Sequence, residues 1–243
     1  MKNSIKWIFF DMGGVLLDDS QAKVKAEQLI LAIIQKINPK ISLSDVQSAW
    51  IKGSPQLGSL NVNVIKHLVR DKPDLTKALA EYENRKSEIN YYITSKIRPE
   101  AKEVLLELAK KYKLGLIANQ NILAKEKLKE AGIYDLLHHQ TVSDENGLEK
   151  PDPKYFQAVF KETGANPNES VIVDDNIERA LIPGKKLGMT TVWYKFQERT
   201  DIPKNQVNFT ITSLADLLDY CPLRCHSREN GNSELEQYLD PRS

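Results

Sequence analysis

Polar residues that could do chemistry follow short apolar segments of this chain. The segment Trp7–Phe10 is followed by Asp11, and Gly13–Gly14 comes two positions later. An apolar run of this length is typical of a buried strand, and in open α/β sheets ligands bind at the carboxyl ends of strands. An aspartate there, beside glycines that let a ligand approach the backbone, is a candidate nucleophile or metal ligand. The alternative is an aspartate that only caps the turn.

Two further apolar segments end in the same way. Leu114–Ala118 is followed by Asn119, and Val171–Val173 is followed by Asp174–Asp175. Lys150 lies between these two segments in the sequence, just before a predicted helix. Because parallel strands bring their carboxyl ends to one edge of a sheet, we expect carboxylates, an amide and an ammonium group to meet there. Carboxylates with backbone and water oxygens are the ligands of a hard cation such as Mg²⁺.

The elements that must position these residues fall into two blocks. Apolar residues at helical spacing fill the first block, and no strand is predicted between Asp18 and Ile97, which indicates an all-helical insertion. From Arg98 onward, strands and helices alternate, which indicates an α/β fold with a parallel sheet covered on both faces. Four helices are predicted in the insertion. The first is Gln21–Ile37, and the second begins after Ser42, which forms a capping box with Asp45. The third begins near Val62, and the fourth runs from near Leu75 to about Tyr92. Beyond it, the predicted strands are Leu114–Ala118, His138–Val142, Val171–Val173, Thr190–Tyr194 and Asn208–Ile211, and the predicted helices are Glu100–Tyr112, Ile122–Ala131, Pro153–Thr163, Ile177–Leu187 and Leu214–Leu218.

Composition excludes several classes of protein. The formal net charge of +1 over 243 residues gives no electrostatic case for binding nucleic acid or a membrane surface. No apolar run approaches the ~20 residues that span a bilayer, and Lys6 and Asp11 interrupt the first apolar stretch, which makes a poor secretory signal. We therefore expect a cytoplasmic protein, as a monomer or homodimer. Cys221 and Cys225 are expected to be incidental thiols, because no second cluster of metal ligands accompanies them.

The motifs together resemble those of the haloacid dehalogenase superfamily of hydrolases. The stretches that carry the resemblance are Phe9–Leu16, Leu116–Asn119, Glu149–Asp152, Val171–Asn176 and Ile182–Trp193. The resemblance implies a Rossmann-like parallel sheet as the core, an all-helical cap domain inserted after the first motif, dependence on Mg²⁺, and phosphatase activity on a small phosphorylated metabolite. The expected division is residues 1–17 for the first strand and nucleophile loop, 18–98 for the helical cap, 99–220 for the rest of the core, and 221–243 for a polar tail that is disordered or foreign to the natural protein.

The resemblance assigns catalytic and substrate-binding roles residue by residue. Asp11 would be the nucleophile that forms an aspartyl-phosphate, and Lys150 would hold its carboxylate and the phosphoryl oxygens. Asn119 would lie beside the phosphate, with Ala118 and Gly14 as further substrate-binding positions.

The resemblance also implies a metal site. Asp11, the backbone carbonyl of Gly13, and Asp175 would bind Mg²⁺, with Asp174 as the alternative to Asp175. The cation would reduce the repulsion between the nucleophile and the phosphate.

Three positions depart from the family pattern and keep other functions open. Gly13 stands where these phosphatases usually carry an aspartate that acts as general acid and base, Ala118 replaces a hydroxyl residue, and Ala180 replaces an acid. These departures suggest, as an alternative, a catalytically degenerate protein that binds a ligand or regulates a partner. A second alternative is a 2-haloacid dehalogenase, although Asp174 and Asp175 would repel a carboxylate substrate unless a cation lay between them.

Some residues outside the motifs have two interpretations. Asp18 and Asp19 lie where the chain enters the insertion. They could be hinge or rim residues, but we expect them to be solvated loop carboxylates. Trp50 and Tyr91 or Tyr92 could line a substrate pocket, but aromatic residues at helical spacing more often pack in a core.

Overall fold

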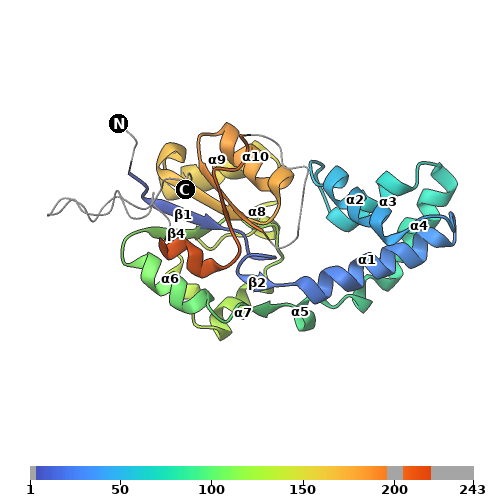
Figure 1. The fold of residues 1–243 in the computed structure, drawn as a ribbon, viewed down its shortest axis with the longest axis horizontal. Coiled ribbons are helices and arrows are strands. Elements are labelled where there is room, and N and C mark those ends of the chain that lie inside the picture. Colours follow the sequence, from blue (N-terminus) through green and yellow to red (C-terminus); the bar gives the residue numbers. More distant parts are fainter. Residues whose placement is uncertain (1–3, 196–204, 220–243) are drawn as a thin grey trace, which may run out of the picture.

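A parallel β-sheet forms the core of the molecule (Figure 1). The computed structural model describes residues 4–195 and 205–219. Within them, neighbouring strands pair in parallel in the order β4-β1-β5-β6-β7. The predicted α/β class is confirmed. The strands of this sheet are β1 (Trp7–Phe10), β4 (Lys113–Leu116), β5 (Ser170–Asp174), β6 (Thr190–Tyr194) and β7 (Phe209–Ile211).

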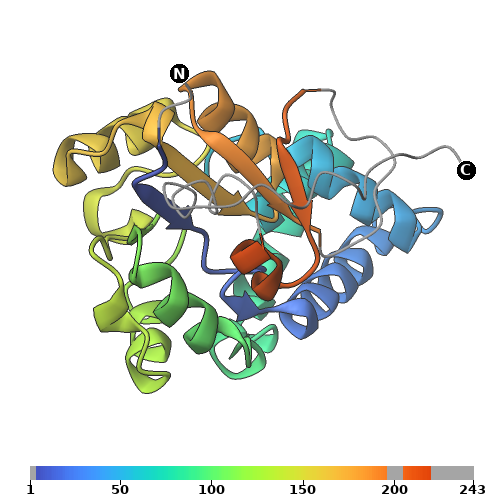
Figure 2. The ribbon, with the colours of Figure 1, turned by 60° about the vertical axis from the view of Figure 1, so that its left-hand side comes forward.

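Helices cover both faces of the sheet (Figure 2). Along β1, Ile8 and Phe10 join the hydrophobic cluster on one face, whereas Trp7 and Phe9 join the cluster on the other. A strand buried on both faces is apolar throughout, which explains the continuous run in the sequence. The first face carries α6 (Ala101–Ala109) and α7 (Ala124–Glu130), and the second carries α9 (Pro153–Thr163) and α10 (Ile182–Lys186).

A helical lobe, residues 20–94, lies to one side of the sheet (Figure 1). It has a hydrophobic cluster of its own, which includes Ile30, Ile33 and Ile65. The predicted capping box is present, because Ser42 and Asp45 exchange hydrogen bonds between side chain and backbone. The helices of the lobe are α1 (Ser20–Gln35), α2 (Leu43–Gly53), α3 (Leu60–Leu68), α4 (Lys72–Arg85) and α5 (Tyr91–Thr94).

Two chain crossings join the lobe to the core. They pair with each other as the short antiparallel strands β2 (Leu17–Asp18) and β3 (Lys96–Ile97). Arg98 fixes the second crossing to the loop after β1, since its guanidinium donates to the carbonyls of Val15 (2.9 Å) and Gly14 (3.0 Å). The same guanidinium lies 4.5 Å from the centre of the Tyr194 ring, a cation–π contact.

Several predicted elements differ from those observed. The predicted strand His138–Val142 is wrong: only an isolated bridge joins His139 to Gly115, and the Val142 N–H instead bonds to the Glu145 side chain at the start of α8 (Ser143–Asn146).

Two predicted helices are broken. The one starting near Leu75 ends at Arg85, and Asn90, with φ of 47°, starts α5 afresh. The predicted helix Ile177–Leu187 begins as a π-helix, Ile177–Leu181, before α10. The polar tail, with Cys221 and Cys225, lies outside the described residues.

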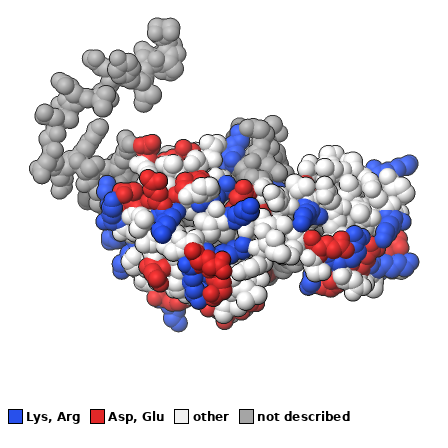
Figure 3. Space-filling model, turned by 90° about the horizontal axis from the view of Figure 1, so that it is seen from below, with Lys and Arg blue, Asp and Glu red and all other residues white. Residues whose placement is uncertain are grey.

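Charges of both signs are intermixed over the face shown in Figure 3, in keeping with the small net charge. Among the described residues, no helix combines the length and apolar character needed to cross a membrane.

Candidate active site

A cleft of about 1030 Å³ lies between the edge of the sheet and the helical lobe. Core residues that line it include Asp11, Lys150 and Asp175. The lobe also contributes, and Trp50, Tyr91 and Tyr92 all face the cleft. These aromatic residues therefore line a cleft, and Trp50 also packs against the lobe's core.

The sheet brings the predicted carboxylates together. Asp11 directly follows β1, and its N–H bonds to the Val173 carbonyl of β5 at 3.0 Å. Asp174 ends β5 and Asp175 follows it. Carboxylate oxygens of Asp11, Asp174 and Asp175 lie within 4.8 Å of one another.

Lys150 balances part of this negative charge. Its Nζ lies 2.6 Å from Asp174 Oδ2 and 3.1 Å from Asp11 Oδ1, although the residue is only 2% exposed. Burial alone would lower the pKa of Lys150, but the two carboxylates raise it above its ordinary value. Lys150 therefore stays protonated and acts as a fixed positive charge beside Asp11.

The two remaining carboxyl groups are held in an environment that disfavours their charge. Burial raises the pKa of Asp175, and the neighbouring carboxylates of Asp174, Asp19 and Asp11 raise it further. Burial and Asp11 also raise the pKa of Asp174, against the opposing effect of Lys150. A bound cation would relieve this repulsion.

The donor set fits a hard divalent cation. Aspartate oxygens are the ligands that Mg²⁺ prefers in proteins. Asp174 already pairs closely with Lys150, whereas Asp175 lines the cleft beside Asp11 and Gly13. Asp11 and Asp175 are thus the residues best placed to hold a metal.

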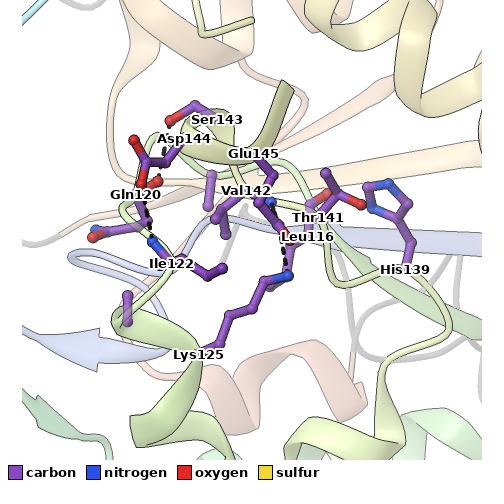
Figure 4. Close-up of polar contacts among 12 residues, drawn as sticks. Leu116, Gln120, Ile122, Lys125, His139, Thr141, Val142, Ser143, Asp144 and Glu145 are labelled. Carbon is purple, nitrogen blue, oxygen red and sulfur yellow. Dashed lines mark hydrogen bonds and ion pairs between the residues drawn. The ribbon is translucent and has the colours of Figure 1, made fainter. Parts of the chain in front are cut away.

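The loop after β4 is fixed to the Lys150 segment. Asn119 Nδ2 donates to the Lys150 carbonyl (2.8 Å), and the Lys150 N–H donates to Asn119 Oδ1 (2.7 Å). Figure 4 shows further contacts of the chain after β4 with the segment at α8: Ser143 Oγ donates to the Gln120 carbonyl (3.3 Å), and Lys125 pairs with Glu145 (2.5 Å).

Two predicted substrate-binding positions lie behind the cleft lining. Ala118 is fully buried, and its N–H bonds to the Tyr155 hydroxyl at 3.3 Å. Gly14 is also buried, and its carbonyl accepts from Arg98. Gly14 has a φ of 72°, and a Cβ there would overlap the Asp175 carboxylate. Its role is therefore to make room for Asp175.

Asp19 occupies the space that a side chain at position 13 would use. A Cβ built on Gly13 would lie 3.0 Å from Asp19 Oδ2 and 3.3 Å from Gln120 Nε2. Asp19 lines the cleft and is partly buried, and burial together with Asp11 raises its pKa to about 6. The expectation of a solvated loop carboxylate is thus wrong for Asp19. Asp18, in contrast, accepts a hydrogen bond from the Ser20 N–H at the start of α1.

The loop between α2 and α3 closes one side of the cleft. Arg179 Nη2 donates to the Gly58 carbonyl (2.6 Å), and Asn176 Nδ2 donates to Ser54 Oγ (3.1 Å). The Gly58 N–H donates to Glu149. These contacts hold the helical lobe against the core.

Comparisons with known proteins agree with this architecture. The sequence pattern of the haloacid dehalogenase-like hydrolases matches residues 5–188. The glyceraldehyde 3-phosphate phosphatase of Pyrococcus furiosus is 28% identical, over 95% of this chain and 96% of that protein. The protein of the same name from Methanocaldococcus jannaschii is 30% identical, over 88% of this chain and 96% of its own length. In fold, the chain is similar to a predicted phosphoglycolate phosphatase from Haemophilus somnus, with a TM-score of 0.63, 19% identity, and coverage of 90% and 99% of the two chains.

Proposed function

The chain belongs to the haloacid dehalogenase-like hydrolases, and from this premise we propose that it is a Mg²⁺-dependent phosphatase of a small phosphate monoester. The observation that carries the proposal is the meeting of Asp11, Asp175 and Lys150 at one edge of the sheet. The names of the two relatives, both phosphatases of a small phosphate ester, support the same reaction class.

Asp11 is the nucleophile in this proposal. Its carboxylate oxygen attacks phosphorus, the bond from phosphorus to the ester oxygen breaks, and an aspartyl-phosphate forms. Lys150 Nζ orients Asp11 and binds a phosphoryl oxygen. Held by Asp11 and Asp175, with the carbonyl of Gly13 as a further ligand, Mg²⁺ would neutralise the charge that the phosphate brings into the cleft.

In this proposal, Asp19 takes the role of general acid and base that an aspartate at position 13 would otherwise have. In its protonated form, Asp19 Oδ2 gives a proton to the departing ester oxygen. Its carboxylate then takes a proton from the water that attacks phosphorus, which releases phosphate and regenerates Asp11. The support for this role is the position of Asp19 Oδ2 where a side chain at Gly13 would project.

The helical lobe acts as a cap in this proposal, with residues 18–98 as the inserted domain. Closure around a small substrate would exclude water and bulky partners. The contacts of Gly58 with Glu149 and Arg179 support a closed arrangement.

Phosphate release from p-nitrophenyl phosphate, with and without Mg²⁺, tests the proposal for the native chain and for Asp11→Asn. We expect turnover that needs Mg²⁺ and disappears in Asp11→Asn. Mg²⁺ binding without any turnover would contradict the proposal and favour a binding or regulatory protein. Release of halide from a 2-haloacid without metal would favour the dehalogenase.

A further inference from the structure

The end of the cleft inside the helical lobe carries two buried polar atoms that lack a hydrogen-bond partner among the described residues: Glu27 Oε1 and Trp50 Nε1. Glu27 is only 4% exposed, and its other oxygen accepts from Gln47 Nε2 at 3.1 Å. Glu27 and Trp50 both line the cleft. Buried polar atoms cost free energy unless a partner satisfies them. A ligand in the cleft can be that partner.

Helix α1 sets the distance between these atoms and the reacting end. Asp19, Lys23 and Glu27 follow one another at four-residue spacing, so they share one face of the helix, and all three line the cleft. Eight residues at about 1.5 Å each separate Asp19 from Glu27 by about 12 Å along the axis. Figure 1 shows α1 leading away from the core.

We propose that Glu27 and Trp50 form a subsite for the terminal hydroxyl groups of a polyol or open-chain sugar phosphate of about six carbons. The inference rests on the proposed phosphatase function, and it names the class of substrate. A hydroxyl group both donates and accepts hydrogen bonds. One terminal hydroxyl donates to Glu27 Oε1, and its neighbour accepts from Trp50 Nε1.

The Glu27 carboxylate and the uncharged polar groups near it favour a neutral, hydroxylated chain at this end of the cleft. The Glu27 carboxylate repels a second phosphate or a carboxylate at the far end of the substrate. The lining also includes Asn61, Tyr82 and Tyr91, whose side chains are joined by hydrogen bonds from Asn61 Nδ2 to the two hydroxyls, at 2.7 Å and 3.2 Å. Amide and phenol groups of this kind suit hydroxyl groups along a carbon chain.

The length of the substrate follows from the reach of an extended chain, which gains about 1.2 Å per bond. A three-carbon polyol phosphate has about five bonds from phosphorus to its last oxygen and reaches about 6 Å. A six-carbon one has about eight bonds and reaches roughly 10 Å, and a hydrogen bond adds about 2.8 Å. Measured along α1 from Asp19, the longer ester therefore spans the distance to Glu27 and the shorter one does not. The expected substrate differs in this respect from the three-carbon ester in the names of the relatives.

The test compares kcat/KM for sorbitol 6-phosphate and glycerol 3-phosphate, with Mg²⁺, in the full-length chain. We expect the native protein to prefer the six-carbon ester by about tenfold or more, the worth of one charged hydrogen bond. Glu27→Gln should remove most of this preference. Trp50→Phe, which deletes the N–H but keeps an aromatic ring, should reduce the preference about fivefold. Glu83→Gln, at an exposed ion pair with Lys86, is the matched control and should leave both values unchanged.

The outcomes separate the subsite from the proposed function. Equal kcat/KM values for the two esters, or a preference that survives in Glu27→Gln, would overturn the subsite and leave the phosphatase standing. If no ester is hydrolysed, p-nitrophenyl phosphate included, the proposed function fails. Calorimetric binding of the two esters to Asp11→Asn then decides the subsite: tighter binding of the six-carbon ester supports it, and equal binding overturns it.

Discussion

Replacing Asp19 with asparagine should separate catalysis from stability, because the two are expected to change in opposite directions. The substitution keeps the shape of the side chain and removes its titratable proton. General acid–base help is worth roughly 100- to 10,000-fold in rate. We expect a loss in this range for an alkyl phosphate ester, and a smaller loss for p-nitrophenyl phosphate, whose leaving group needs little protonation.

The effect on stability follows from the pKa of Asp19, which burial and Asp11 raise from 3.8 to about 6. This difference between the unfolded and folded pKa corresponds to about 3 kcal/mol of folding free energy. Because the folded pKa is the higher one, the stabilisation from this group is complete below the unfolded pKa and is lost as the pH rises through about 6. At pH 8, Asp19→Asn should therefore increase the free energy of unfolding by up to about 3 kcal/mol. Near pH 4, the native chain and Asp19→Asn should have similar free energies of unfolding.

Urea unfolding at both pH values and phosphate release across a pH series are the assays. With the alkyl ester, kcat of the native chain should fall as the pH rises through the pKa of Asp19, because the acid form of Asp19 is depleted, and Asp19→Asn should lack this decline. Asp18→Asn is the matched control, since the amide oxygen of asparagine can still accept the hydrogen bond from the Ser20 N–H. Equal losses with both esters would refute the role of Asp19 as an acid. Restoring a carboxylate with Gly13→Asp in an Asp19→Ala background should recover part of the rate.

Three further substitutions test the rest of the site. Lys150→Met leaves Asp11 and the rest of the buried cluster without their cation, so it should abolish turnover. It should also lower the free energy of unfolding, measured with urea at pH 7, by about 3 kcal/mol. This loss of stability should shrink as the pH falls. Mg²⁺ at 100 times its Kd should raise the free energy of unfolding of the native chain by about 2.7 kcal/mol, which is measured as a higher Tm. Asp175→Asn should lose most of this gain. An equal gain in the native chain and in Asp175→Asn would count against the metal site. Gly14→Ala should abolish Mg²⁺-dependent turnover because its Cβ displaces the Asp175 carboxylate, whereas Gly147→Ala, with a similar φ of 68° but no atom within 4 Å of the new Cβ, should not.

The sequence predicted those parts of the site that follow strands. Asp11 comes directly after an apolar run and Asp175 comes one residue after another, and parallel pairing of these runs brings their ends to one edge. The burial of Asp19 could not be predicted, because nothing in the local sequence distinguishes it from Asp18. Its position depends on the path of the chain from β2 back past Gly13, which is a tertiary property.

The sequence carries one signal of the position of Glu27. It lies four positions from Lys23 and eight from Asp19, so three charged residues repeat on one face of a helix. A charged face is usually solvated, and only the packing of α1 beside the cleft shows otherwise. The strand β3 could not be predicted, because a pairing of two residues has no hydrophobic period to recognise.

The anchoring of Arg98 to the carbonyls of Gly14 and Val15 has a mechanical consequence. It ties the returning chain to the core, so any rotation of the lobe must pivot beyond that point, around the paired strands β2 and β3. Asp19 directly follows β2, beside this axis, whereas Trp50 belongs to α2, which lies away from β2 in Figure 1. A given rotation would displace Trp50 widely and Asp19 hardly at all. The proton donor would then stay in place whether the lobe is open or shut, whereas the distant hydroxyl subsite would be assembled only on closure.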